Sequence, residues 1–132
     1  MRENLENILF TKLKASLPAE FKTMLVRGHS TNERHIPYIS LDVGELRPFG
    51  DLQSTDGIFE ADVSVAIADS AHDIEYTELF KRIRAVMSAF ENFSYAEDNI
   101  LINALYYENE TDARDDNNLG SVMTLKAVVQ FL

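Results

Sequence analysis

From residue 57 to residue 91 the sequence reads GIFEADVSVAIADSAHDIEYTELFKRIRAVMSAFE, and its hydrophobic period changes from two to about 3.6 within that span. The first part alternates apolar and mostly polar residues, which is typical of a strand with one buried face. The apolar positions are Phe59, Ala61, Val63, Val65 and Ile67. We therefore expect a strand in an antiparallel sheet that is covered on one side.

The second part, residues 74–91, predicts an amphipathic helix. The residues expected on its apolar face are Tyr76, Leu79, Phe80, Ile83, Val86, Met87 and Phe90, and those opposite are Glu75, Glu78, Lys81, Arg82 and Arg84. Acidic residues come early and basic residues late, which suits the helix dipole. In the turn before the helix, Ser70 or Asp73 is expected to be the N-cap.

Towards the N-terminus, residues 2–16 predict another helix, with Leu5, Ile8, Leu9 and Leu13 on one face. Pro18 ends or redirects it, because proline lacks the N–H that a further turn needs. Residues 21–27 fit either a short strand or a second helical piece, and residues 28–34 predict an exposed polar loop. From Pro37 the period is two, which predicts a strand with Ile39, Leu41 and Val43 on one side.

Towards the C-terminus, two more strands are expected. Residues 100–107 are apolar on both sides for much of their length, which predicts a central strand, and residues 122–132 alternate. The polar segment between them, residues 108–120, is expected to be a loop. The predicted fold is a single α+β domain, residues 1–132, with the order α-(β)-β-β-α-β-β. Its mixed, mainly antiparallel sheet would have four to five strands, with two main helices packed on it.

Composition excludes several kinds of site and partner. The 132 residues include no cysteine, so a disulfide framework, a thiolate zinc site and a cysteine nucleophile are excluded. The net charge of −10 opposes binding to phosphate backbones and to anionic lipid surfaces. The sequence has neither an apolar signal segment nor a membrane-length apolar run, so we expect a protein made and used in a cytosol.

No pattern of catalytic residues emerges from the sequence. His29 falls in the expected polar loop and His35 directly follows it, while His72 lies between Asp69 and Asp73 in a capping turn. There is no G-x-S-x-G segment and no glycine-rich phosphate loop. We therefore expect no enzyme, no catalytic residue, no cofactor and no metal site. A histidine-based site remains the alternative.

The acidic segment after residue 107 is the least ordinary feature. Its candidate channel or interface residues are Glu108, Glu110, Asp112, Arg114, Asp115 and Asp116. They could be a solvated hairpin, face a polyanion, or fit a basic patch on a neighbour. A calcium-binding loop is a further alternative, although the segment lacks the turn glycine and the bidentate glutamate of an EF-hand.

A second candidate surface contains Arg47 and Phe49, in the connection that follows the strand beginning near Pro37. Arginine and aromatic side chains carry much of the binding energy of protein interfaces. We therefore consider both residues candidates for a subunit interface. The alternative is a loop that packs on its own domain.

Taken in order, these segments resemble a known family. The N-terminal helix precedes PYISLDVG at residues 37–44 and GIFEADVSV at residues 57–65. The helix at residues 74–91 and two terminal strands around Asp112-Ala113-Arg114 complete the pattern. The whole order resembles that of the tail terminator, or tail completion, proteins of long-tailed bacteriophages.

That resemblance implies a subunit of a hexameric ring that stops growth of the tail tube and joins the tail to the neck. The implied partners are other copies of the chain, the tail tube protein and neck or connector proteins. DNA would be only a passing, non-specific polyanion, and no membrane is involved. The implied location is the virion, after assembly in the host cytoplasm, and the implied fold is a mixed sheet with helices packed against it.

Three alternatives remain open. The chain could be another phage neck or connector protein. It could be a subunit of a contractile secretion machine, because such tubes share their architecture. It could also be a small α+β ligand-binding module or enzyme, with His29, His35 and His72 near a pocket.

Overall fold

The computed structural model describes residues 2–27, 37–49, 57–70, 76–97, 99–114 and 118–132. Within these residues the chain forms three helices and seven strands. The helices are α1 (Arg2–Ser16), α2 (Ala19–Lys22) and α3 (Tyr76–Phe90). The strands are β1 (Leu25–Arg27), β2 (Tyr38–Val43), β3 (Arg47–Pro48), β4 (Ile58–Ser70), β5 (Tyr95–Glu97), β6 (Ile100–Arg114) and β7 (Asn118–Phe131).

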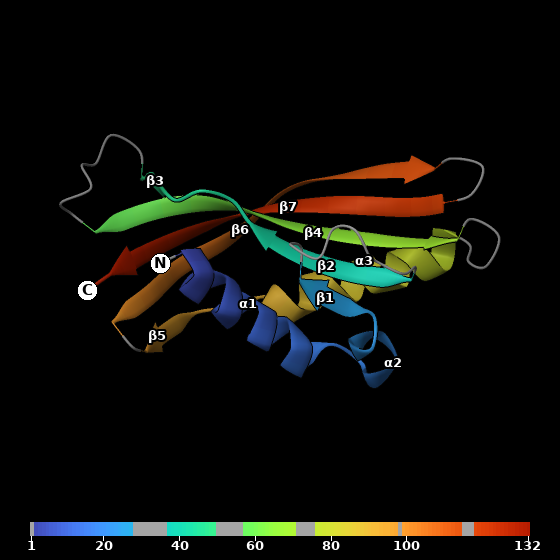
Figure 1. The fold of residues 1–132 in the computed structure, drawn as a ribbon, viewed down its shortest axis with the longest axis horizontal. Coiled ribbons are helices and arrows are strands. Elements are labelled where there is room, and N and C mark those ends of the chain that lie inside the picture. Colours follow the sequence, from blue (N-terminus) through green and yellow to red (C-terminus); the bar gives the residue numbers. More distant parts are fainter. Residues whose placement is uncertain (1, 28–36, 50–56, 71–75, 98, 115–117) are drawn as a thin grey trace.

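All seven strands belong to one mixed sheet (Figure 1). Its order is β1-β2-β4-β7-β6-β5, and β3 pairs with β4 beside this path. β1 runs parallel to β2, whereas the other pairs are antiparallel. The three longest strands, β4, β7 and β6, are neighbours in this sheet.

The predicted fold class, α+β with four to five strands, is therefore wrong. The described residues are mostly sheet, in a mixed arrangement of seven strands. Three of these strands, β1, β3 and β5, have only two or three residues, which is too short for a period of two to be visible in the sequence. β6 and β7 are also longer than expected, because polar residues continue the hairpin.

The core lies between the sheet and the helices α1 and α3, which pack on the same face and contact each other (Figure 1). The predicted apolar faces of the first helix and the alternating strand are confirmed, with Ile8 and Phe59 only partly buried. The fully buried members include Leu5, Leu9, Leu13, Ala61, Val63, Val65 and Ile67. The ambiguous segment 21–27 contains both alternatives, since α2 ends at Lys22 and β1 begins at Leu25.

The predicted helix at residues 74–91 is confirmed as α3, but its faces differ from the prediction. Tyr76, Phe80 and Met87 are 41%, 45% and 41% exposed, although they were expected in the core. Arg82, expected on the polar face, is buried. Ser70 lies in β4, while Asp73 is outside the described residues, so the N-cap stays a prediction.

The predicted central strand at residues 100–107 lies between β7 and β5, but it has a neighbour on both sides only over Ile100–Ile102. β6 pairs with β7 along its length, but β5 covers only Ile100–Ile102 on the other side. Tyr106 and Tyr107 are 57% and 43% exposed. Beyond Ile102, no strand among the described residues pairs with this side of β6, so its apolar character on both faces arises from an edge with exposed aromatic rings. Such an edge is available to pair with another chain.

Candidate assembly surfaces

Most of the expected acidic loop is strand. Glu108, Glu110, Asp112 and Arg114 lie in β6, whereas Asp115 and Asp116 fall outside the described residues. The loop prediction failed because backbone pairing does not require apolar side chains. A polar hairpin can extend beyond the core with its side chains in water while its N–H and C=O groups bond across the strands.

Arg47 and Glu108, singled out separately in the sequence, belong to one ladder of ion pairs. The ladder crosses β3, β4, β7 and β6 on the sheet face opposite the helices. Arg47 Nη2 lies 3.3 Å from Asp62 Oδ1 and 3.6 Å from Glu60 Oε1. Lys126 Nζ lies 3.8 Å from Glu60 Oε2 and 3.3 Å from Glu108 Oε1. Positive and negative groups therefore alternate across four strands.

The ladder favours the charged form of its two bases. The hydrogen bonds and charge of Asp62 raise the pKa of Arg47, and Glu60 adds to the shift. The hydrogen bond and charge of Glu108 raise the pKa of Lys126, again with help from Glu60. These side chains are solvated, and exposed ion pairs contribute little to stability. What the ion pairs change is the charge of this sheet face, because Arg47 and Lys126 are already paired with acids of the same chain.

Phe49, the other candidate interface residue, follows β3. Its N–H donates to the carbonyl oxygen of Ile58 at 3.1 Å, which fixes the backbone beside β4. The ring remains 38% exposed. Phe49 is thus an aromatic side chain on an anchored backbone, as a subunit contact requires. Arg47, by contrast, is already bound to carboxylates of its own chain.

Sequence reasoning missed an apolar groove between α3 and β6. Its volume is about 560 Å³. Phe80 and Met87 of α3 line one side and Leu105 and Tyr107 of β6 the other, while Leu125 of β7 also lines it. The sequence did contain a signal for this groove. The apolar face of the helix at residues 74–91 is wider than the core can cover, so some of its apolar residues must stay exposed. Phe80 and Met87 are those residues.

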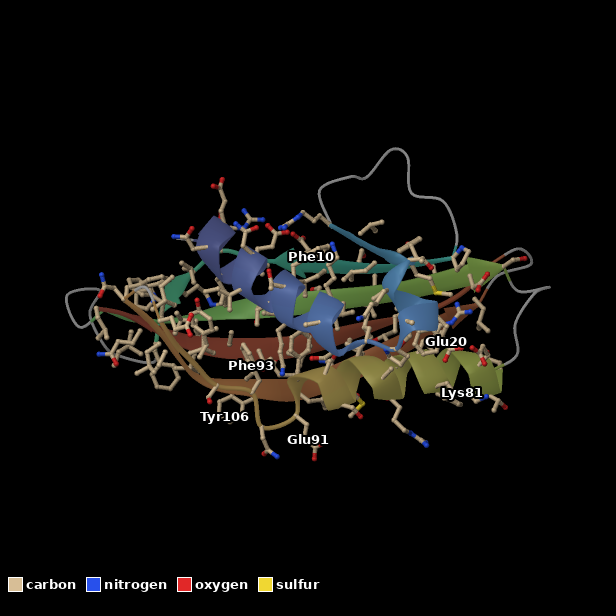
Figure 2. All side chains as sticks on the ribbon, turned by 90° about the horizontal axis from the view of Figure 1, so that it is seen from below. Phe10, Glu20, Lys81, Glu91, Phe93 and Tyr106 are labelled. Atoms are coloured by element: carbon tan, nitrogen blue, oxygen red, sulfur yellow. The ribbon has the colours of Figure 1, made fainter. Side chains whose placement is uncertain are left out.

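Acidic groups accompany the groove. Glu91 and Glu110 line it together with one base, Arg84, and Figure 2 shows Glu91 at the end of α3 on the outer side of the molecule. Partial burial raises the pKa of Tyr107, and the nearby charges of Glu110 and Asp112 raise it further. The phenol is therefore a neutral hydrogen-bonding group beside an apolar floor. This combination suits an apolar side chain or a basic group of a partner.

A buried ion pair fixes the position of α3. Arg82 Nη1 donates to Asp69 Oδ2 at 2.7 Å, and both side chains are buried. Asp69 Oδ1 also accepts the N–H of Ser70 at 2.6 Å, and the Arg82 guanidinium lies 5.9 Å from the centre of the Phe21 ring. The pair thus joins α3, β4 and α2. Spacing could have revealed it, because Arg82 is three residues after buried Leu79 and four before buried Val86.

The histidine candidates cannot be placed, because His29, His35 and His72 lie outside the described residues. In the described part of the chain, no three His, Cys, Asp or Glu side chains are grouped so as to hold a metal ion. No helix among the described residues is long and apolar enough to cross a bilayer.

Comparison of the chain with protein-family models and with curated proteins found no match. Its function is therefore argued from the charged ladder, the exposed Phe49 ring and the α3–β6 groove.

Proposed function

We propose that this chain is a structural assembly subunit, a tail terminator that caps a phage tail tube as a ring and joins the tail to the neck. The observation that carries this proposal is the exposed side formed by α3 and β6. Three large apolar or aromatic side chains, Phe80, Met87 and Tyr107, line the groove there and are each more than 40% exposed. Methionine and aromatic residues are enriched where proteins contact one another.

The backbone of β6 supports the same function. Beyond Ile102, β6 has a partner strand only on its β7 side within the described residues. An unpaired edge with exposed aromatic rings favours aggregation unless another chain covers it. A ring closes by heterologous contacts, in which a patch on one copy meets a different patch on the next. Ring closure would therefore cover this edge in every copy.

Charge supports the role proposed for DNA. A net charge of −10 weakens binding to the phosphate backbone. In the ladder, Arg47 and Lys126 are paired with carboxylates of the same chain and attract a polyanion less than free bases would. We propose that DNA passes through the ring as a non-specific polyanion, and that the tail tube and neck proteins bind the ring itself. A different neck or connector protein would use the same kinds of contact.

A second function, a ligand-binding module, is favoured by one observation. The α3–β6 groove has a volume of about 560 Å³, within the range of small-molecule sites. A ligand that binds only the folded state raises the melting temperature. A thermal-shift panel of metals, nucleotides and metabolites distinguishes the two functions. Stabilisation by one compound, lost in Met87→Glu, would favour the module.

The assembly role is tested by solution mass and negative-stain images of the chain, alone and mixed with purified tail tube protein. The expected result is a ring at one end of each tube and arrest of further tube growth. Tube protein with an unrelated acidic protein of similar size is the control. Tubes that grow on unchanged, with no density at their ends, would show that the chain is not a terminator.

A further inference from the structure

We infer that a second copy of this chain docks its α1–α2–β1 side against the α3–β6 side of the first, so that successive copies join head to tail. This inference rests on the proposed function and identifies the two surfaces of the ring contact. We define the basic side as residues 2–27 and the acidic side as residues 91–114 together with the adjoining groove face of α3. β1 of the basic side is at one end of the sheet order and β6 and β5 are at the other, whereas α1 also reaches the acidic side, with Lys12 Nζ 5.9 Å from the centre of the Phe93 ring (Figure 1).

The charges of the two sides are complementary. The basic side has five bases against three acids, a net charge of +2, in a chain whose total is −10. Residues 91–114 have one base against six acids, and Arg84 adds a second base on the groove face of α3, so the acidic side has a net charge of −4. Opposite charges on two faces favour contact between them and disfavour contact of either face with itself. The complement of the acidic side is therefore present on the same chain.

The basic side presents its charge on ordered elements. Lys14 and Lys22 are exposed at the ends of α1 and α2. Arg27 of β1 is held in place, because its guanidinium lies 4.3 Å from the centre of the Phe10 ring and Nη1 donates to Asn7 Oδ1 at 2.7 Å. Such fixed bases lose little side-chain freedom on meeting carboxylates.

The acidic side supplies the apolar part of the contact. Glu110 and Asp112 are exposed on β6, and Glu110 lines the same groove as Phe80, Met87 and Tyr107. An interface with an apolar centre and a charged rim is the usual arrangement. Because the two sides differ, the contact is heterologous and repeats from copy to copy until the ring closes.

The experiment is a charge swap followed by sedimentation over a concentration series. One variant carries Glu110→Lys and Asp112→Lys, and the other carries Lys14→Glu and Lys22→Glu. Each alone is expected to self-associate at least about tenfold more weakly than the wild type, because like charges then meet. An equimolar mixture restores opposite charges at every contact, so its association returns to the wild-type range. Glu45→Lys, a reversal at an exposed position outside both sides, should have no effect.

A second measurement does not depend on how well the reversals fold. Since the chain has no cysteine, Lys22→Cys and Glu110→Cys each introduce a single thiol. Oxidation of the mixed proteins should give covalent dimers, whereas neither protein alone should. Crosslinking of Glu110→Cys with itself would overturn the inference in favour of a symmetric edge contact. Assembly that is unaffected by the charge reversals would also overturn it and leave the ring function intact. A wild-type chain that is monomeric at every concentration would overturn the docking contact. The proposed function is tested separately, by whether the chain caps tail tubes.

Discussion

Removal of Asp69 is expected to destabilise the fold strongly. Asp69→Ala leaves the buried guanidinium of Arg82 without the carboxylate that it contacts at 2.7 Å. Breaking a buried ion pair from one side costs about 3–5 kcal/mol. Glu78 Oε1, at 3.9 Å from Arg82 Nε, partly replaces the lost charge, so we expect a loss near the lower value, about 3 kcal/mol. For a chain of this length that corresponds to a fall in melting temperature of about 12 °C.

The control is the double variant Asp69→Leu with Arg82→Met, which replaces the pair by apolar side chains. Replacement of a buried pair by apolar residues is often neutral, so we expect stability within about 1 kcal/mol of the wild type. Urea unfolding at one fixed, low protein concentration measures both variants, because self-association would add stability. A loss of less than about 1 kcal/mol in Asp69→Ala would refute the reasoning. So would a double variant as unstable as the sum of its single changes.

Three further predictions concern other parts of the chain. Gly57→Ala should cost about 1–3 kcal/mol in urea unfolding, because Gly57 has a φ of +70° and an added Cβ would lie 2.7 Å from a backbone oxygen. Titration of phenolate absorbance should show a component that ionises above the ordinary tyrosine pKa of 10.0 and is absent in Tyr107→Phe, because burial and Glu110 raise the pKa of Tyr107. Since that folded pKa lies above the ordinary value of 10.0, stability should fall as pH rises above 10.0, and fall less in Tyr107→Phe. Phe80→Ser with Met87→Ser should change unfolding by less than about 0.5 kcal/mol, because both side chains are exposed, yet it should abolish assembly; normal assembly would contradict the role of the groove.

Sequence alone predicted the elements with long, regular periods. The strand through Phe59 and Ile67 and the helix through Leu79 and Phe90 combine many residues on one buried face, so the pattern is strong. It did not predict β3 or β5, because strands of two or three residues are set by neighbouring strands and not by their own composition. The length of β6 was missed because its polar end pairs through backbone groups alone.

The candidate surfaces were predicted only in part. Arg47 and Glu108 were singled out by residue type and position, but their connection through Glu60 and Lys126 depends on strand register. Register across four strands cannot be read from separate segments of sequence. The α3–β6 groove was missed for a related reason, because the exposure of Phe80 depends on how far the sheet extends beneath α3.

Hydrogen exchange of the β6 amides tests most directly whether another protein copy covers the α3–β6 side. In dilute, monomeric protein, the amides between Leu105 and Asp112 that point away from β7 should exchange fast, because no described strand pairs with them. On assembly, alone or at tube ends, those amides and the Phe80–Met87 face of α3 should become protected. Unchanged exchange at both places in fully assembled protein would contradict the assignment of this side as the contact between copies.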